Sequence, residues 1–476
     1  MKRLALLLLL CAPLARAQAP TYVQGVAGSS GYTTAHASMV LSLPNPTLSG
    51  NTIICAGQFG YVSGTSVSVA DDKSDSFTTR GTHADSNQVV WIADKIGATA
   101  GARVITVSYS GTAPAYVQAA CAEFYNVSAY DTVSAGNNST GTAITAGSAT
   151  PSQTGDLVIL VTEQDSTGAV TSFTVGSQSN ITWKFLQNDW GFGSVVDEMV
   201  EWGVYNSTAA LNGTATLAPS GGWNAIEALY KAGSAGAAPT QVPYVNMVAH
   251  YNMYALAASQ TIGIPIPAGD SMAVYDHICP STYTSALSDS ASNTWTIAGQ
   301  ASSSGGYSVL GYVSGASPSF NPSMTLTITE SAAAQDCDIT VSGFTGTTTY
   351  DSTTGFAHAT GNQTTSGNLA TLSITPSAKN ELFFIDTGIS SHQITGTASP
   401  SYCYGNVVYS STEASTGEFD ENNFRGACYN GLSTSSFTPT LTTSGGAVGQ
   451  WQAAAIGFKS LGSGAAPKMT LLGVGP

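Results

Sequence analysis

The sequence predicts an all-β protein, with two tandem β-sandwich (jelly-roll-like) domains behind a cleaved signal peptide. Three observations lead to this prediction: a composition rich in Ser, Thr and Gly, short Val/Ile/Thr runs that alternate in polarity, and one long internal duplication. Of 476 residues, 60 are Ser, 58 are Thr and 51 are Gly, while only 9 % are charged. The scarcity of Lys, Glu, Leu and Arg argues against helical bundles and coiled coils.

Charge and hydrophobicity exclude other classes of protein. The formal net charge of −15 argues against a nucleic-acid-binding protein, because such a protein needs basic surface to replace counterions. The hydrophobic content of 42 % argues against general disorder, since a large core can be buried. No run beyond the N-terminus approaches the roughly 18 apolar residues that a membrane-spanning helix needs. We therefore expect neither a nucleic-acid partner nor a membrane span.

The N-terminus has the features of a secretory signal peptide. Lys2 and Arg3 precede an apolar run over residues 4–12, and Ala15-Arg16-Ala17 forms a small-x-small cleavage site. We predict cleavage after Ala17, with Ala19 as the alternative, and assign residues 1–17 to the signal. Export would place the mature chain, with 10 basic and 28 acidic side chains, outside the cell or at its surface.

The mature chain contains two copies of one module. Residues 223–231 (WNAIEALYK) precede the linker GSAGAAP, and residues 451–459 (WQAAAIGFK), 228 positions later, precede GSGAAP. A repeat of this length indicates tandem domains rather than a solenoid. We predict a first module over 18–232, a linker over 233–239, a second module over 240–461, and a linker with a strand-like tail over 462–476. The other landmarks keep the same order in both copies: Asp71 and Asp289, Tyr130-Asp131 and Tyr350-Asp351, residues 155–160 and 380–385.

Each copy consists of short strand-like runs. Residues 103–108 (RVITVS) and 324–329 (MTLTIT) alternate between polar and apolar side chains, and Gly, Asn, Asp and Ser separate such runs. Strands without alternating helices favour a β-sandwich or jelly roll, and about 215 residues suit one large sandwich per copy. The segment from Lys468 to Pro476 resembles the first strand of a further module. It is either a frayed end or a strand that pairs with the sheet edge of a neighbouring molecule.

Six cysteines remain after signal removal, and an even number in an exported chain indicates disulfides. We predict the pairs Cys55–Cys121 and Cys279–Cys337, which leaves Cys403 and Cys428 at the ends of one hairpin-like segment. The alternative is six buried free thiols.

Two sets of residues are candidate metal ligands. Asp71, Asp72 and Asp75 are closely spaced carboxylates that would suit calcium, but they lack the EF-hand pattern, and such residues also favour hairpin turns. His277 next to Cys279 offers a zinc donor set that would compete with disulfide formation.

One acidic and aromatic segment is the strongest candidate for ligand chemistry. The carboxylates Asp189, Asp197, Glu198 and Glu201 could supply the acid and base of a glycoside hydrolase. The aromatic residues in the same segment could instead form a glycan-binding surface or pack in a core, and they are Trp183, Trp190, Phe192 and Trp202.

The ordered landmarks resemble those of poorly characterised β-sandwich modules that recur in secreted bacterial and phage-associated proteins. The shared set comprises an N-terminal Tyr-Val strand, an Asp-containing hairpin, a mid-module Tyr-Asp and a closing Trp…Phe/Tyr-Lys strand. This resemblance implies an extracellular sandwich and transfers no catalytic residue.

The first hypothesis for function is an exported, non-enzymatic binding, adhesion or surface-structural protein, since two copies gain avidity even from weak sites. Its partner would be a glycan or another cell-surface polymer. The alternatives are a secreted glycan-degrading enzyme and a filament subunit that self-associates through the C-terminal tail.

Overall fold

The structure is a computed structural model, and its described part is all-β, which confirms the predicted fold class. No helix occurs in this part, so none is long and apolar enough to cross a membrane. For some strand residues the backbone alone is described. The described residues are 19–460 without 30–34, 44–45, 166–171, 177, 190–196, 234–244, 254–257, 265, 267–271, 280–281, 304–305, 315–318, 321–323, 334–336, 345–346, 366–367, 371, 380, 390–393, 400–406, 412–422, 431–433 and 444–448.

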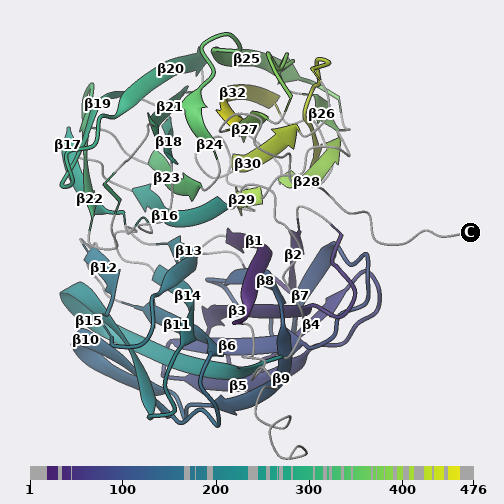
Figure 1. Ribbon diagram of the computed structural model, residues 1–476, viewed down its shortest axis with the longest axis vertical. Helices are drawn as coiled ribbons and strands as arrows, with labels where there is room; N and C mark the ends of the chain where they lie inside the picture. Colours follow the sequence, from purple (N-terminus) through teal and green to yellow (C-terminus); the bar gives the residue numbers. More distant parts are fainter. Residues whose placement is uncertain are drawn as a thin grey trace, which may run out of the picture.

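Each copy forms two sandwiches, a finer division than the one large sandwich expected; we name them 1a, 1b, 2a and 2b (Figure 1). Sandwich 1a contains β1 (Thr21–Ser29), β2 (Ser38–Ser42), β3 (Thr52–Gly60), β4 (Ser66–Asp71), β5 (Thr78–Ala84), β6 (Gln88–Lys95), β7 (Val104–Ser110) and β8 (Gln118–Tyr125). Sandwich 1b contains β9 (Val127–Val133), β10 (Asn137–Ala149), β11 (Asp156–Gln164), β12 (Ser172–Val175), β13 (Lys184–Asp189), β14 (Asp197–Tyr205) and β15 (Leu211–Ala232).

Copy 2 repeats this division. Sandwich 2a contains β16 (Val245–Met253), β17 (Ser259–Gly263), β18 (Met272–Cys279), β19 (Thr284–Asp289), β20 (Thr296–Ser303), β21 (Gly306–Ser314), β22 (Thr325–Glu330) and β23 (Cys337–Phe344). Sandwich 2b contains β24 (Thr347–Tyr350), β25 (Phe356–Gln363), β26 (Leu369–Ala370), β27 (Glu381–Ile389), β28 (Ile394–Ser399), β29 (Val407–Ser411), β30 (Asn423–Asn430), β31 (Thr440–Thr443) and β32 (Gly449–Ser460).

The strand order in each sandwich is that of a jelly roll. In 1a the larger sheet runs β1-β8-β3-β6-β5 and the smaller sheet runs β2-β7-β4; in 2a the corresponding orders are β16-β23-β18-β21-β20 and β17-β22-β19. Sandwich 2b follows the same plan, with β32-β27-β30-β29 facing β26-β31-β28. In 1b the single 22-residue strand β15 replaces both β31 and β32, because its first part pairs with β12 and its last part with β11.

The larger sheets continue from one copy into the other. Strand β13 of 1b pairs in parallel with β16 of 2a, and β29 of 2b pairs in parallel with β1 of 1a. These two joins create one sheet of 11 strands and one of 12 strands. The two joins are equivalent, because β13 corresponds to β29 and β16 corresponds to β1, so the copies are related by an approximate twofold arrangement.

The two large sheets face each other, and the smaller sheets cover their outer faces (Figure 1). A central core between the large sheets includes Tyr22, Phe124, Trp202, Phe384 and Phe458, whereas separate cores lie under the smaller sheets. Central strands are therefore covered on both faces, and every residue of β3, β11 and β27 is buried. Burial on both sides explains why these segments are nearly continuous apolar runs.

Candidate functional site

The acidic and aromatic segment does not converge on one site among its described side chains. Glu198 and Glu201 lie on β14 three residues apart, and they therefore point to opposite faces of the sheet. Both are fully buried, and burial raises the pKa of Glu201 well above its usual range. The backbones of Asp189 and Asp197 lie on β13 and β14, but their side chains lie outside the described residues. Glu198 and Glu201 thus cannot flank one glycosidic bond as an acid–base pair.

The aromatic residues of the segment also separate. Trp183 packs in the core beneath the smaller sheets, whereas Trp202 packs in the central core. The Trp202 ring stacks on Tyr22 with centroids 5.7 Å apart, and the Lys184 ammonium lies 4.7 Å from the ring centroid. Trp190 and Phe192 lie outside the described residues.

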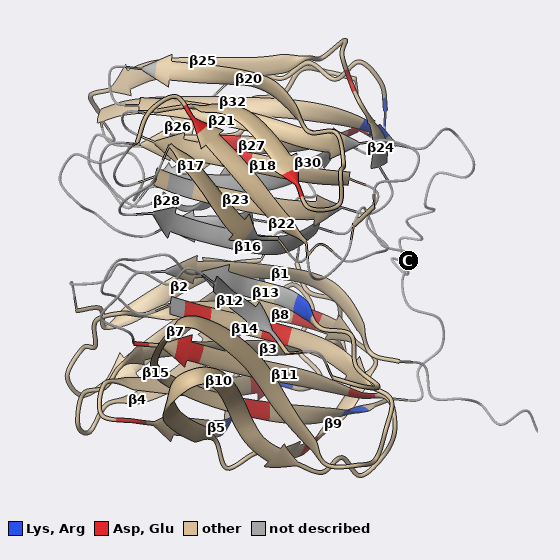
Figure 2. Ribbon diagram, turned by 90° about the vertical axis from the view of Figure 1, so that its left-hand side faces the viewer, with Lys and Arg blue, Asp and Glu red and all other residues tan. Residues whose placement is uncertain are grey.

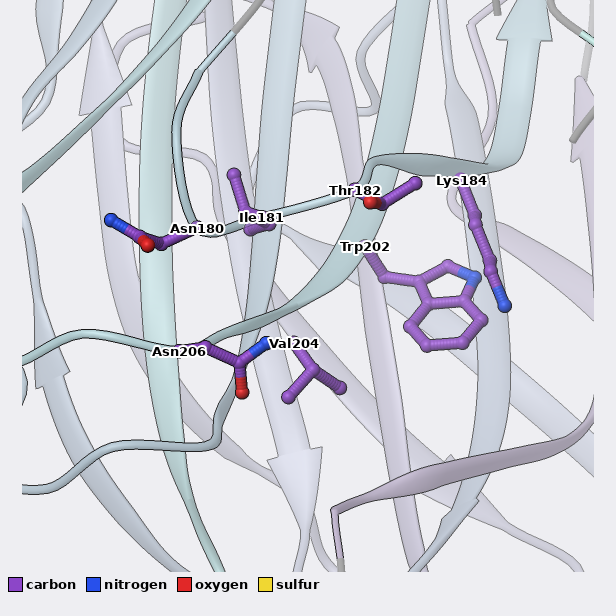
Figure 3. A pocket seen from close by; sticks show the side chains of 7 residues that line it. All are labelled: Asn180, Ile181, Thr182, Lys184, Trp202, Val204 and Asn206. Atoms are coloured by element: carbon purple, nitrogen blue, oxygen red, sulfur yellow. The ribbon is translucent and has the colours of Figure 1, made fainter. Parts of the chain in front are cut away.

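A pocket opens where this segment leaves the sheet. Its volume is about 420 Å³, and Asn180, Ile181, Thr182, Lys184, Trp202, Val204 and Asn206 line it (Figure 3). The loop before β13 supplies Asn180 to Thr182, and the end of β14 supplies the opposite wall. The backbone N–H of Asn206 donates to the Asn180 carbonyl at 2.9 Å, which fixes the two walls relative to one another. The buried Trp202 indole N–H has no acceptor among the described residues.

The Asp-rich segment at the end of β4 forms a tight turn. Asp71 Oδ1 accepts the backbone N–H groups of Lys73 and Asp75 at 2.9 and 3.0 Å. Asp75 accepts the backbone N–H of Thr99 at 2.6 Å and the Lys95 ammonium at 3.0 Å. These contacts give most of the carboxylate oxygens a protein donor, as hairpin-turn residues require.

Copy 2 contains the same turn at the predicted position. Asp289 Oδ1 accepts the N–H groups of Ala291 and Asn293 at 2.9 and 3.0 Å, and its Oδ2 accepts the Trp295 indole N–H at 2.8 Å. The duplicated landmark Asp71/Asp289 therefore has a structural basis in both copies.

The two predicted disulfides are present in the structure. Cys55–Cys121 joins β3 to β8, and Cys279–Cys337 joins β18 to β23, with Cα–Cα distances of 4.0 and 4.3 Å. The two disulfides join equivalent strands at different positions along them. Thr52 pairs with Phe124 in copy 1, and Met272 pairs with the equivalent Phe344 in copy 2. Cys55 lies three residues after Thr52, whereas Cys279 lies seven residues after Met272. Cys403 and the side chain of Cys428 lie outside the described residues.

The residues proposed to bind zinc lie in a buried cluster around the Cys279–Cys337 disulfide. Ligand atoms of His277, Cys279 and Cys337 lie within 4.8 Å of one another, and His277 Nε2 lies 3.7 Å from Glu330 Oε2. The disulfide occupies both sulfur atoms, so the oxidised chain lacks the thiolates that zinc prefers. Burial raises the pKa of Glu330 to about 7.

A more specific cluster recurs in both copies, and we call it the acid–lysine corner. In copy 1 it comprises Asp131, Ser152, Asp156 and Lys231. Asp131 accepts the Ser152 backbone N–H at 2.6 Å and the Ser152 hydroxyl at 2.8 Å, and its Oδ1 lies 3.3 Å from Lys231 Nζ. Burial and a hydrogen bond with Asp131 raise the pKa of Asp156 to about 7. Burial alone would raise the pKa of Asp131, but its hydrogen bonds with Ser152, Asp156 and Lys231 lower it.

In copy 2 the corner comprises Asp351, Ser377, Glu381 and Lys459. Asp351 Oδ1 lies 2.9 Å from Lys459 Nζ, and the Ser377 hydroxyl contacts both Asp351 and Glu381. Burial and the hydrogen bond with Asp351 raise the pKa of Glu381 to about 7. Despite its burial, Asp351 has a pKa well below the usual range, because Ser377, Lys459 and Glu381 hydrogen-bond to it. Each corner therefore combines a carboxyl group of lowered pKa, a second carboxyl group with a pKa of about 7, and a lysine Nζ within 3.3 Å of the first.

In the sequence, the acids and lysines of the corner stand out only as landmarks of the duplication. The signal that could have found the corner is the retention of charged residues in both copies of a chain with so few charges (Figure 2). Ser152 and Ser377 belong to a shared Thr-Pro-Ser-x-x-x-acid-Leu motif that was missed. The chain matches no protein-family model, and no curated protein is similar to it in sequence.

Proposed function

We propose that the chain is an exported, non-enzymatic binding protein of the adhesion or surface-structural kind. Its ligand would be a neutral polyhydroxylated polymer such as a cell-surface glycan, bound in the pocket beside Trp202. The pocket lining carries this proposal, because amide and hydroxyl groups that can hydrogen-bond to sugar hydroxyls lie beside an indole N–H that has no acceptor among the described residues. The net charge of −15 disfavours strongly anionic polymers.

The structure also supports a rigid scaffold rather than a reactive cleft. The described acids Glu198 and Glu201 are buried on opposite faces, and the Asp71 turn uses its carboxylates for local hydrogen bonds. Two disulfides brace the sandwiches, as is common in exported proteins. The pocket therefore offers recognition without an evident acid–base pair among the described residues.

Isothermal titration calorimetry of the full-length protein with a panel of soluble polysaccharides measures binding affinity and tests this proposal. We expect Thr182→Ala and Asn206→Ala each to weaken binding about two- to tenfold, the value of one hydrogen bond. Thr78→Ala, at another exposed threonine on β5, is the matched control and should leave affinity unchanged. Absence of binding to every polysaccharide, or binding that neither pocket variant weakens, would refute the proposal. Release of shorter oligosaccharides would favour the enzymatic alternative.

A further inference from the structure

We propose that each acid–lysine corner forms an intramolecular amide cross-link: Lys231 with Asp131 in copy 1, and Lys459 with Asp351 in copy 2. The cross-link would join the first strand of sandwiches 1b and 2b to the last strand. This inference concerns a covalent modification of the scaffold and does not depend on the pocket ligand.

The strand pairing holds the reacting groups together. Asp131 lies on β9 and Lys231 on β15, where Tyr130 and Tyr230 are register partners. Asp351 directly follows β24, whose residue Tyr350 pairs with Phe458, the neighbour of Lys459. The Nζ–Oδ1 distances of 3.3 and 2.9 Å are those of ion pairs, and they hold each lysine nitrogen against the carboxyl group that it would attack. Because both partners lie on or directly beside paired strands of one sheet, their effective concentration is high.

A second carboxyl group in each corner can relay the required protons. In the resting pair, Lys459 is an ammonium ion and Asp351 is a carboxylate, and neither form is reactive. Glu381 shares the Ser377 hydroxyl with Asp351, and it can donate its proton to Asp351 and then accept one from the Lys459 ammonium. The free amine attacks the Asp351 carboxyl carbon, the C–N bond forms, and the C–O bond breaks to release water.

The reaction balances without an added reagent. One ammonium and one carboxylate become one amide and one water molecule, and Glu381 ends with the proton that it held at the start. Asp156 would act in the same way for Lys231 and Asp131. The hydrogen bond with Asp351 raises the pKa of Lys459, so its free amine is rarely populated. A low population of free amine is sufficient, because the reaction occurs only once per molecule and the amide, once formed, remains.

The duplication supports the assignment. Copy 2 places Ala427 at the register position of Trp202, so the pocket chemistry was not retained in both copies. In contrast, the corner retains its lysine, its aspartate and its serine, and the exchange of Asp156 for Glu381 preserves the carboxyl group. A conventional ion pair would explain the proximity but would leave both side chains unmodified.

Intact-mass spectrometry of the full-length protein, unfolded and thiol-reduced, distinguishes the two cases. We compare the wild type with Lys231→Arg and Lys459→Arg, which keep the positive charge but cannot form this amide. Each variant should exceed the wild-type mass by the Lys-to-Arg difference plus one water molecule. Lys379→Arg, at an exposed lysine two residues before Glu381, should differ by the substitution alone. If Lys231→Arg and Lys459→Arg also differ by the substitution alone, the proposal is wrong.

A second variant tests the proton relay. Glu381→Gln cannot exchange a proton with Asp351, so we expect no amide between Lys459 and Asp351 in this variant. Its mass should therefore exceed the mass of the cross-linked form by one water molecule. Proteolysis of the wild type should release one branched peptide that joins Lys459 to Asp351, and the same peptide should be missing from Glu381→Gln. A branched peptide of unchanged yield in Glu381→Gln would overturn the relay.

Discussion

Glu227 makes the stability of the fold depend on pH in a calculable way. Its side chain is fully buried on β15, its Oε2 accepts the Gly213 backbone N–H at 2.8 Å, and burial raises its pKa to about 8. Between pH 4.5 and pH 8 the folded chain therefore holds a proton that the unfolded chain has released. Since the folded state binds more protons in this window, its stability falls as the pH rises.

The magnitude follows from this linkage. A difference of one proton changes the free energy of unfolding by about 1.4 kcal/mol per pH unit, or roughly 3 kcal/mol between pH 5 and pH 7. Glu227→Gln keeps an oxygen acceptor for Gly213 and cannot titrate. Urea unfolding followed by tryptophan fluorescence should show that the variant loses about 3 kcal/mol less than the wild type over this interval. Equal pH dependence in the two proteins would refute the assignment of a raised pKa to Glu227.

Two further predictions concern the packing of the scaffold. The disulfide-bonded cysteines are 66 residues apart in copy 1 and 58 in copy 2, so the loop-entropy model gives about 4 kcal/mol of stabilisation for each. The double variants Cys55→Ala/Cys121→Ala and Cys279→Ala/Cys337→Ala should thus lose similar unfolding free energies in guanidinium titrations, and a loss below about 1 kcal/mol for either would contradict the model. Gly57→Ala should destabilise the protein by about 3 kcal/mol or more, because its Cβ would meet the backbone of β8, and calorimetry showing an unchanged Tm would disprove this contact.

Local chemistry allowed part of the structure to be predicted. The hairpin turn at Asp71 depends on hydrogen bonds within five residues, and its repetition at Asp289 is visible in the sequence. The disulfides followed from cysteines on strands near the start and middle of each copy. In these cases the signal and the structure lie close together along the chain or recur in both copies.

The remaining features depend on register and on distant pairing. The opposite orientation of Glu198 and Glu201 follows only once both residues are known to lie on one continuous strand. The boundary between the two sandwiches of copy 1 was hidden because Asn126 alone separates β8 from β9, which leaves no loop to mark it. The parallel joins β13–β16 and β1–β29 connect segments with no local signal for pairing. The corner combines residues from three separated segments, so its chemistry emerges only after folding.

The parallel joins between the copies also have a consequence for how the protein could change. Such an arrangement is what a symmetric homodimer would have if its two subunits were fused into one polypeptide. Tethering makes the association intramolecular, so dilution cannot separate the halves as it would separate free subunits. In a homodimer every substitution appears in both subunits, whereas in a fused chain each half can change by itself. A pocket beside Trp202 can then arise in one half while Ala427 occupies the equivalent position in the other.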